Sequence, residues 1–193
     1  MSIIKSVLIF LILFVVLGAV KDLYFQSLLE KSITQATGLR TTVSSLSVSP
    51  VAPHFRVKEI LIDNPEGFEE RHLARISEAF VDWNVAELLK GRCHLRKAQL
   101  TVEEFFVIQK KGGLLNTEIL LAQSQRKGFP LSIDELDLTI ERVISKNSGN
   151  PAEIKQWDLM VRHKRFKNLE GFDALVQTVL SEVPSRKLVS TPR

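Results

Sequence analysis

An uncharged apolar segment near the amino terminus limits what this chain can fold into more than any other feature. Val7–Val20 reads VLIFLILFVVLGAV, fourteen residues without a charge. A bilayer core of about 30 Å needs roughly 20 helical residues. Ile3 to Tyr24 meets that length if Lys5 and Lys21 extend toward the lipid head groups. The sequence therefore predicts a transmembrane helix.

Two other interpretations of this segment stay open. A cleaved secretory signal also begins with a basic residue such as Lys5, but Leu17-Gly18-Ala19 supplies only one of the two small residues that cleavage needs. A buried core helix would not be so uniformly apolar on all its faces. The flanking charges favour a short cytoplasmic amino terminus, with the remaining chain exported.

Composition excludes several kinds of protein for the remaining chain. The 193 residues leave room for one domain plus an appendage, and 45% hydrophobic with 25% charged residues excludes disorder throughout. The single cysteine, Cys93, excludes a disulfide framework and a structural zinc site of several thiolates. The 26 basic residues lie among 22 acidic ones, so we expect no nucleic-acid binding.

Alternating apolar residues follow the segment and predict strands. A helical pattern runs to Thr37 and stops at Gly38. Six strands are then predicted over residues 39–48, 55–62, 79–85, 98–108, 136–140 and 157–161. In the second of these, Phe55 and Val57 share one parity and Ile60 the other, so we expect a bulge near Lys58-Glu59.

Turns and helices join the predicted strands. A turn is predicted at Asn64-Pro65-Glu66-Gly67 and a short helix over Leu114–Gln123. A last, amphipathic helix is marked by Phe172, Leu175, Val176, Val179, Leu180 and Val183. The predicted fold class is mainly β with flanking helices (α+β): an N-terminal transmembrane helix, a curved, taco-like antiparallel sheet and a C-terminal amphipathic helix. Residues 1–38 form the anchor and its extension, 39–183 the β module, and 184–193 a flexible tail.

The order of these motifs resembles a known family. An anchor and a helix ending at Gly38 precede a strand running into IDNPEGF (Ile62 to Phe68), and LRKAQLTVEE (Leu95 to Glu104) precedes a stretch containing Gly113 and Asn116. FKNLEGFDALVQTVLSEV (Phe166 to Val183) completes the set. This resembles the N-terminal module of AsmA/TamB-like proteins of the bacterial envelope. The resemblance implies an inner (cytoplasmic) membrane protein with the bulk of its chain in the periplasm.

The resemblance also implies a curved sheet whose apolar inner surface is related to phospholipid-conducting grooves. A sheet curled around an unfilled apolar face would exclude water around acyl chains. The candidate lining residues are Val81, Trp83, Leu100, Val102, Leu138, Leu159 and Val161. The same residues could instead pack against the last helix as a closed core.

Two further groups are candidates for binding. Asn64, Pro65, Gly67 and Phe68 could form a recognition loop, although a structural turn is the simpler interpretation. Asn116 is expected to fix a backbone turn. The one concentrated basic stretch could meet anionic head groups or an acidic partner, or could be a solvated strand end; it consists of Arg162, His163, Lys164, Arg165 and Lys167.

No pattern indicates catalysis, so we expect a protein that is not an enzyme. The four histidines are at positions 54, 72, 94 and 163, without metal-ligand spacing, so neither a metal nor another cofactor is expected. The acidic pairs Glu69-Glu70 and Glu103-Glu104 would face opposite sides of a strand.

We therefore expect a single-pass, membrane-anchored envelope protein that binds membrane phospholipid and assists lipid transport, lipid homeostasis or envelope assembly. The alternative is an anchored scaffold that binds another envelope protein, or a second copy of itself, through the edge of its sheet.

Overall fold

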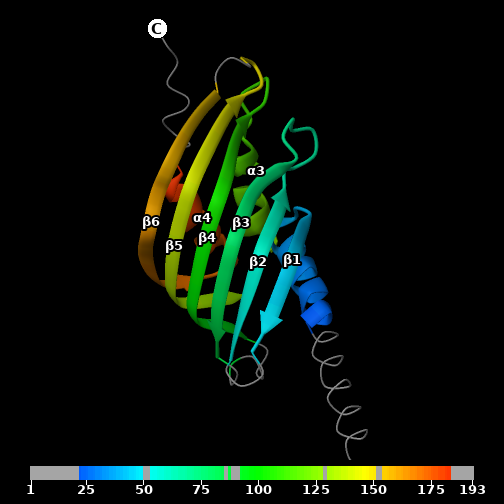
Figure 1. The fold of residues 1–193 in the computed structure, drawn as a ribbon. Coiled ribbons are helices and arrows are strands. Elements are labelled where there is room, and N and C mark those ends of the chain that lie inside the picture. The colour runs from blue at the N-terminus through cyan, green and yellow to red at the C-terminus, as the bar shows by residue number, and fades with distance from the viewer. Residues whose placement is uncertain are drawn as a thin grey trace, which may run out of the picture.

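The computed structural model describes residues 22–49, 53–84, 87, 92–127, 130–150 and 154–183. In these residues six strands form one sheet, in the order in which they follow along the chain (Figure 1). They are β1 (Thr41–Val48), β2 (His54–Asp63), β3 (His72–Trp83), β4 (Cys93–Gln109), β5 (Leu131–Asn147) and β6 (Ile154–Glu170). The helices are an N-terminal helix over residues 22–37, α3 (Asn116–Lys127) and α4 (Phe172–Glu182).

The prediction of an entirely antiparallel sheet is wrong. β4 and β5 run parallel, with Cys93 opposite Leu131 and Gln109 opposite Asn147, whereas the other neighbouring strands are antiparallel. The connection through α3 is the reason, because its 12 residues carry the chain back along the sheet and let β5 begin at the same end as β4. The sheet is therefore mixed.

The predicted membrane-spanning stretch, Ile3 to Tyr24, lies almost entirely outside the described residues, and so does the tail from 184 to 193. Within the part of the chain that the structure describes, no helix is both long enough and apolar enough to cross a bilayer. The N-terminal helix ends at Thr37, as predicted. Gly38 follows it with a φ of 71°, a left-handed conformation that glycine adopts without a steric penalty.

The β-bulge predicted near Lys58-Glu59 is wrong, but β2 is irregular at Glu59, whose φ is 54°. In a regular strand, residues three apart point to opposite faces of the sheet. Val57 and Ile60 are nevertheless both buried, so the alternation of side chains is interrupted between them. The pairing with β3 keeps one register across this point, so no residue is inserted. In β5, Ile140 and Val143 are likewise both buried. The buried side chains therefore stay on one side of the sheet, although along each strand they change between odd-numbered and even-numbered positions.

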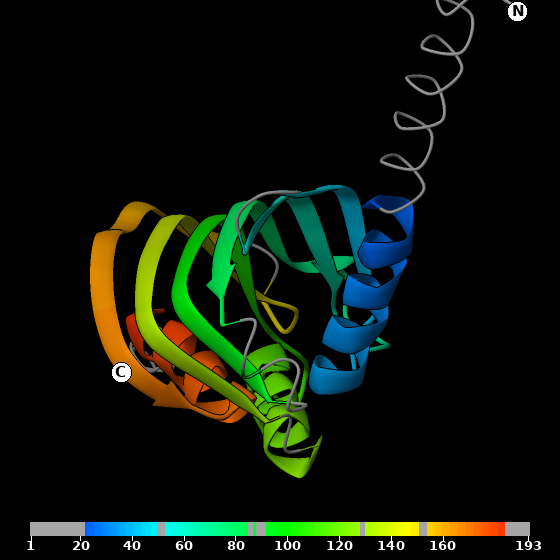
Figure 2. The same ribbon diagram turned by 90° about the horizontal axis from the view of Figure 1, so that it is seen from below.

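Helices fill the concave side of the sheet. Figure 2 shows the sheet curling around α3 and α4, while the N-terminal helix runs along the β1 edge. Leu120 of α3 and Val176 of α4 belong to the same buried cluster as Leu138 and Ile140 of β5. The hydrophobic core therefore lies between the sheet and these two helices.

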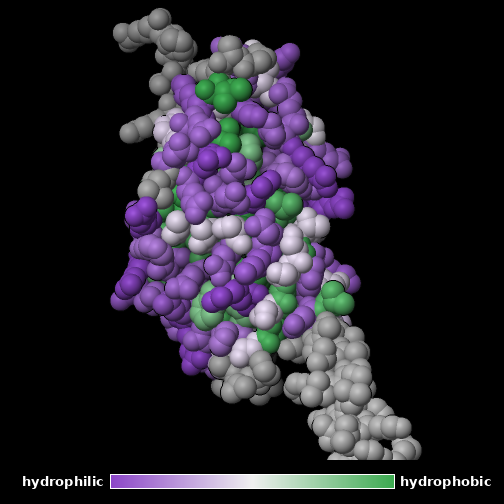
Figure 3. Space-filling view, in the orientation of Figure 1, coloured by the Kyte–Doolittle hydropathy of each residue, from purple (hydrophilic) through white to green (hydrophobic). Residues whose placement is uncertain are grey.

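The convex side of the sheet is polar and carries cross-strand ion pairs. Arg142 of β5 lies 3.1 Å from Glu104 of β4 and 3.2 Å from Asp158 of β6. Figure 3, which shows the side of the sheet away from α3 and α4, is mainly hydrophilic. Exposed pairs of this kind contribute little to stability. They identify this side as the one in contact with water.

Candidate lipid-contacting end of the sheet

Four of the predicted groove residues fall in the half of the sheet that the helices cover. Val102, Leu138 and Val161 are 2%, 0% and 8% exposed and belong to the buried cluster that includes α3 and α4 residues. The side chain of Leu159 lies outside the described residues. The three described side chains therefore pack as a closed core rather than line an open trough.

The other three predicted groove residues, Val81, Trp83 and Leu100, are half-buried. Val81 pairs with Phe55 of β2, and the rings of Trp83 and Phe55 meet edge to face with their centroids 5.8 Å apart. Ala79, two residues before Val81, pairs with Leu100. Val81 and Trp83 lie where β3 ends, beside the start of β2, whereas Leu100 lies further along β4, opposite the core residue Leu138.

This end of the sheet carries a group of half-buried apolar side chains, which we call the foot end: Phe25, Val48, Phe55, Trp83 and Leu95. Neighbouring members lie on paired positions, since Val48 pairs with Phe55 and Trp83 with Leu95. Sequence reasoning named Trp83 as a groove residue and placed Phe25 at the membrane interface, but it did not bring these two together with Val48, Phe55 and Leu95. Their shared location depends on the register of the strands, which the sequence does not show.

The first described turn of the N-terminal helix lies at the foot end. The backbone N–H of Val48 donates to Asp22 Oδ1 over 3.5 Å, so the beginning of the helix sits beside the last residue of β1. Apolar side chains on the outer side of the same helix are exposed: Leu23 is 65%, Tyr24 66% and Leu28 47% exposed. The described chain therefore begins, after the apolar Val7–Val20 segment, at the end of the sheet that carries these half-buried and exposed apolar side chains.

The indole nitrogen of Trp83 is the polar atom within the foot end. It is buried and has no hydrogen-bond partner among the described residues. Buried tryptophan N–H groups usually find an acceptor. The backbone N–H of Trp83 does donate to the carbonyl oxygen of Pro53 over 3.0 Å, which holds the indole at the rim of the sheet.

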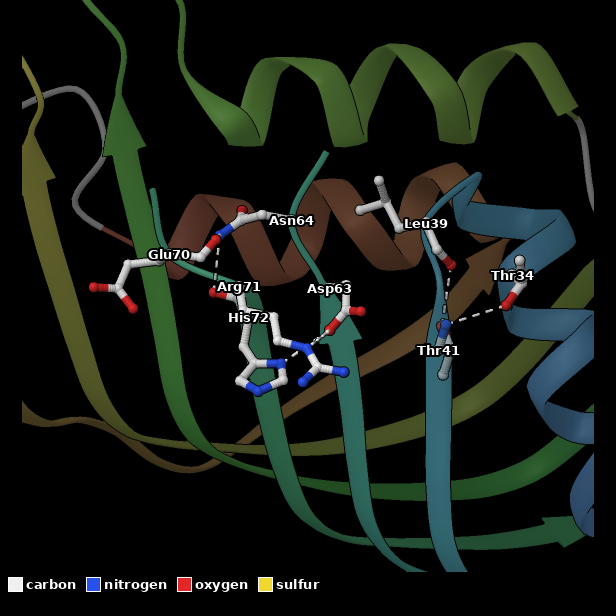
Figure 4. Close-up of polar contacts among 8 residues, drawn as sticks. All are labelled: Thr34, Leu39, Thr41, Asp63, Asn64, Glu70, Arg71 and His72. Atoms are coloured by element: carbon white, nitrogen blue, oxygen red, sulfur yellow. Dashed lines mark hydrogen bonds and ion pairs between the residues drawn. The ribbon is translucent and has the colours of Figure 1, made fainter. Parts of the chain in front are cut away.

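The opposite end of the sheet brings the two most distinctive sequence motifs into contact. The side chain of Asn64 donates to the carbonyl oxygens of Glu70 and His72, each over 2.9 Å, and so closes the turn between β2 and β3 (Figure 4). Asn116 is 0% exposed and donates to Asn64 Oδ1 over 2.8 Å. It also accepts the backbone N–H of Ile108 at 3.0 Å.

The rest of this turn is held by packing and charge. Gly67 has a φ of 81°, which favours glycine. Phe68 lies under the Lys110 ammonium group, 4.2 Å from nitrogen to ring centroid, and Lys110 also donates to the carbonyl oxygen of Glu66. Pro65 precedes these residues within the same turn. The arrangement has the contacts of a structural turn.

The basic stretch on β6 has acidic neighbours. Lys164 lies 2.7 Å from Glu182 of α4, and His163 lies 3.1 Å from Asp137 of β5. Arg165 pairs in register with the same Asp137, and Lys167 with Glu135. Arg162 is exposed. Most of the stretch is therefore partly neutralised within the fold, which leaves little net charge for an anionic ligand.

The described residues offer no metal centre, since none of their His, Cys, Asp and Glu side chains form a group of three or more. His72, His94 and His163 each contact a single aspartate, at 2.9, 2.8 and 3.1 Å. Cys93 is half-buried, and burial raises the pKa of its thiol above the ordinary value. A protonated thiol is a poor nucleophile.

The foot end offers half-buried apolar side chains beside the first described turn of the N-terminal helix, where an apolar ligand could make contact. Comparisons with protein-family models, curated proteins and solved structures find no match for this chain.

Proposed function

We propose that the protein is a membrane-attached module that contacts phospholipid acyl chains through the foot end of its sheet. The observation that carries this proposal is the edge-to-face pair of Trp83 and Phe55 among half-buried apolar side chains, at the end where the N-terminal helix begins. Aromatic rings with one polar atom are favoured at the boundary between lipid and water.

The sequence before the described residues supports a membrane location. Val7–Val20 is uncharged and apolar, and Ile3 to Tyr24, which contains it, has the length of a membrane anchor. Leu23 and Tyr24 would then lie at the level of the head groups, where an exposed tyrosine and leucine are stabilised. The foot end would face the same membrane.

The resemblance to the N-terminal module of AsmA/TamB-like proteins supports a location and a cellular process for this contact. A module of this kind, held in the inner membrane with its sheet in the periplasm, would assist phospholipid transport or homeostasis or the assembly of the envelope. The packed core at Leu138 favours contact with lipid at the end of the sheet over passage of lipid along it.

Lipid photolabelling tests the proposal. The full chain would be reconstituted in phosphatidylcholine nanodiscs containing a phospholipid with a diazirine at the end of one acyl chain. After irradiation, mass spectrometry would locate the labelled peptides. We expect labels on peptides containing Val48, Phe55 or Trp83, because these side chains form the rim closest to the bilayer.

Two exposed apolar residues at the opposite end provide an internal control. Leu114 is 46% and Ile154 58% exposed, so they would be labelled if apolar exposure alone decided the outcome. Labels concentrated at Leu114 and Ile154, with none at the foot end, would contradict the proposal.

A further inference from the structure

The two edges of the sheet are protected in different ways. β6 carries four basic residues within the range 162–167, and two of its residues, His163 and Asn168, have φ angles of 47° and 54°. Charges and local backbone irregularities are the usual protection of an edge strand against pairing with other chains. β1 has neither: TTVSSLSV contains no charge, and the residues with positive φ angles lie outside it.

The N-terminal helix supplies the protection that β1 lacks. Four of its side chains, spaced four residues apart, reach the backbone of β1: Asp22, Gln26, Glu30 and Thr34. Glu30 Oε1 accepts the N–H of Val43 at 2.7 Å, and Gln26 Nε2 donates to the carbonyl oxygen of Val43 at 2.5 Å. Thr34 Oγ1 accepts the N–H of Thr41 at 3.2 Å (Figure 4). Side chains on one face of the helix thus occupy positions that the backbone of another strand would take.

A second face of the helix holds it against the domain. Phe25, Leu29 and Ile33, again spaced four residues apart, pack against the hydrophobic core. The polar contacts and the apolar contacts are therefore made by separate faces, and the polar contacts can be removed without removing the apolar ones.

We infer that the N-terminal helix is a guard that prevents the β1 edge from pairing with the β1 edge of a second copy of this chain. Two β1 strands in antiparallel contact would meet without like charges, whereas two β6 strands would bring the basic residues of one copy, Arg162, Lys164, Arg165 and Lys167, against those of the other. The occupant of a released β1 edge is thus a second copy, joined by a two-fold axis. This inference is independent of the proposed lipid contact.

The test compares self-association of the full chain in detergent micelles with that of a guard variant, Gln26→Ala/Glu30→Ala/Thr34→Ala, by sedimentation velocity. The variant loses three polar contacts, so its helix leaves β1 more often. We expect its dimer dissociation constant to be lower by about tenfold or more. A variant that is folded by circular dichroism and associates no more tightly than the unmodified chain would overturn the inference.

A matched variant shows which edge associates. Ser44 is exposed, and its neighbours Val43 and Ser45 pair with Ile60 and Lys58, which puts it opposite Glu59. Adding Ser44→Lys to the guard variant places like charges at the centre of a β1–β1 contact and should restore the monomer. Dimers that persist despite Ser44→Lys would show association elsewhere and would also overturn the inference. If the triple variant does not fold, Thr34→Val replaces it, since this change removes only the contact with Thr41. The same results for its self-association would then support or overturn the inference.

Discussion

The side-chain nitrogen of Asn116 donates a hydrogen bond of 2.8 Å to the side-chain oxygen of Asn64, 52 residues earlier in the chain. This bond joins the turn between β2 and β3 to the first residue of α3. Asn116 also donates to the carbonyl oxygen of Phe106 over 2.8 Å, and it accepts the N–H of Ile108. One buried amide therefore joins the β2–β3 turn, the start of α3 and strand β4. All three lie at the end of the sheet opposite the foot end.

Replacing Asn116 tests how much this contact stabilises the fold. Asn116→Ala leaves the buried N–H of Ile108 and the Oδ1 of Asn64 without their partner, so we expect a loss of about 2–3 kcal/mol in the free energy of unfolding. Urea denaturation measures it. Asn150→Ala, at an exposed turn position, is the control and should change the value by less than about 0.5 kcal/mol. Equal effects of the two variants would contradict a structural role for Asn116.

Leu138→Ala tests whether the middle of the concave side is a packed core. Leu138 is 0% exposed, so its truncation should leave a cavity and cost about 2–5 kcal/mol in urea denaturation. Val81→Ala, at a half-buried position on the same side, should cost less. A Leu138→Ala protein as stable as the unmodified chain would indicate that this position lines an open space.

The thiol of Cys93 should react slowly. Burial raises the pKa of Cys93, so at any given pH a smaller fraction is thiolate than in free cysteine. We expect the reaction with a disulfide reagent at pH 8 to be slower than that of free cysteine and to speed up as the pH rises further. Unfolding in urea should remove the difference. A folded-state rate equal to that of free cysteine would contradict this prediction.

The pKa of the Asp158 carboxyl group is lowered, whereas that of Cys93 is raised. Hydrogen bonds from Gln156 at 2.9 Å and from Arg142 at 3.2 Å lower the pKa of Asp158 by stabilising its charged form. Its contribution to stability is therefore present above the pKa of the unfolded chain and is lost as the pH falls through the lower folded value. Gln156→Ala should raise the pKa of Asp158 in a carboxyl NMR titration. An unchanged titration would assign the shift to Arg142 alone.

Much of the element order could be predicted from the sequence, because each element carries its own local signal. The six strands and the last helix follow from apolar periodicity, and Gly38 marks the end of the N-terminal helix. The lengths of β5 and β6 could not be predicted in this way. β5 spans Leu131–Asn147, well beyond the predicted 136–140, because the change of pleat between Ile140 and Val143 breaks the simple alternation.

The direction of β5 was missed for a different reason. Strand direction depends on the connection, and residues 109–135 between the two predicted strands, with a predicted helix at Leu114–Gln123, were long enough for a parallel crossover. The foot end could not be predicted in full, since Val48, Phe55 and Leu95 become neighbours only through strand register. The polar spacing of Asp22, Gln26, Glu30 and Thr34 was a usable signal, because residues four apart share one face of a helix.

Tryptophan fluorescence can detect lipid contact at the foot end without any added label. The chain contains two tryptophans, Trp83 in the foot end and Trp157 on β6. Trp157→Phe leaves only the Trp83 emission, and Trp83→Phe leaves only the Trp157 emission. Each variant of the full chain would be placed in nanodiscs of phosphatidylcholine with brominated acyl chains, which quench indoles that they touch.

We predict strong quenching of Trp83 and an unchanged emission from Trp157, relative to nanodiscs without bromine. An unquenched Trp83, or equal quenching of both indoles, would rule out lipid contact at the foot end.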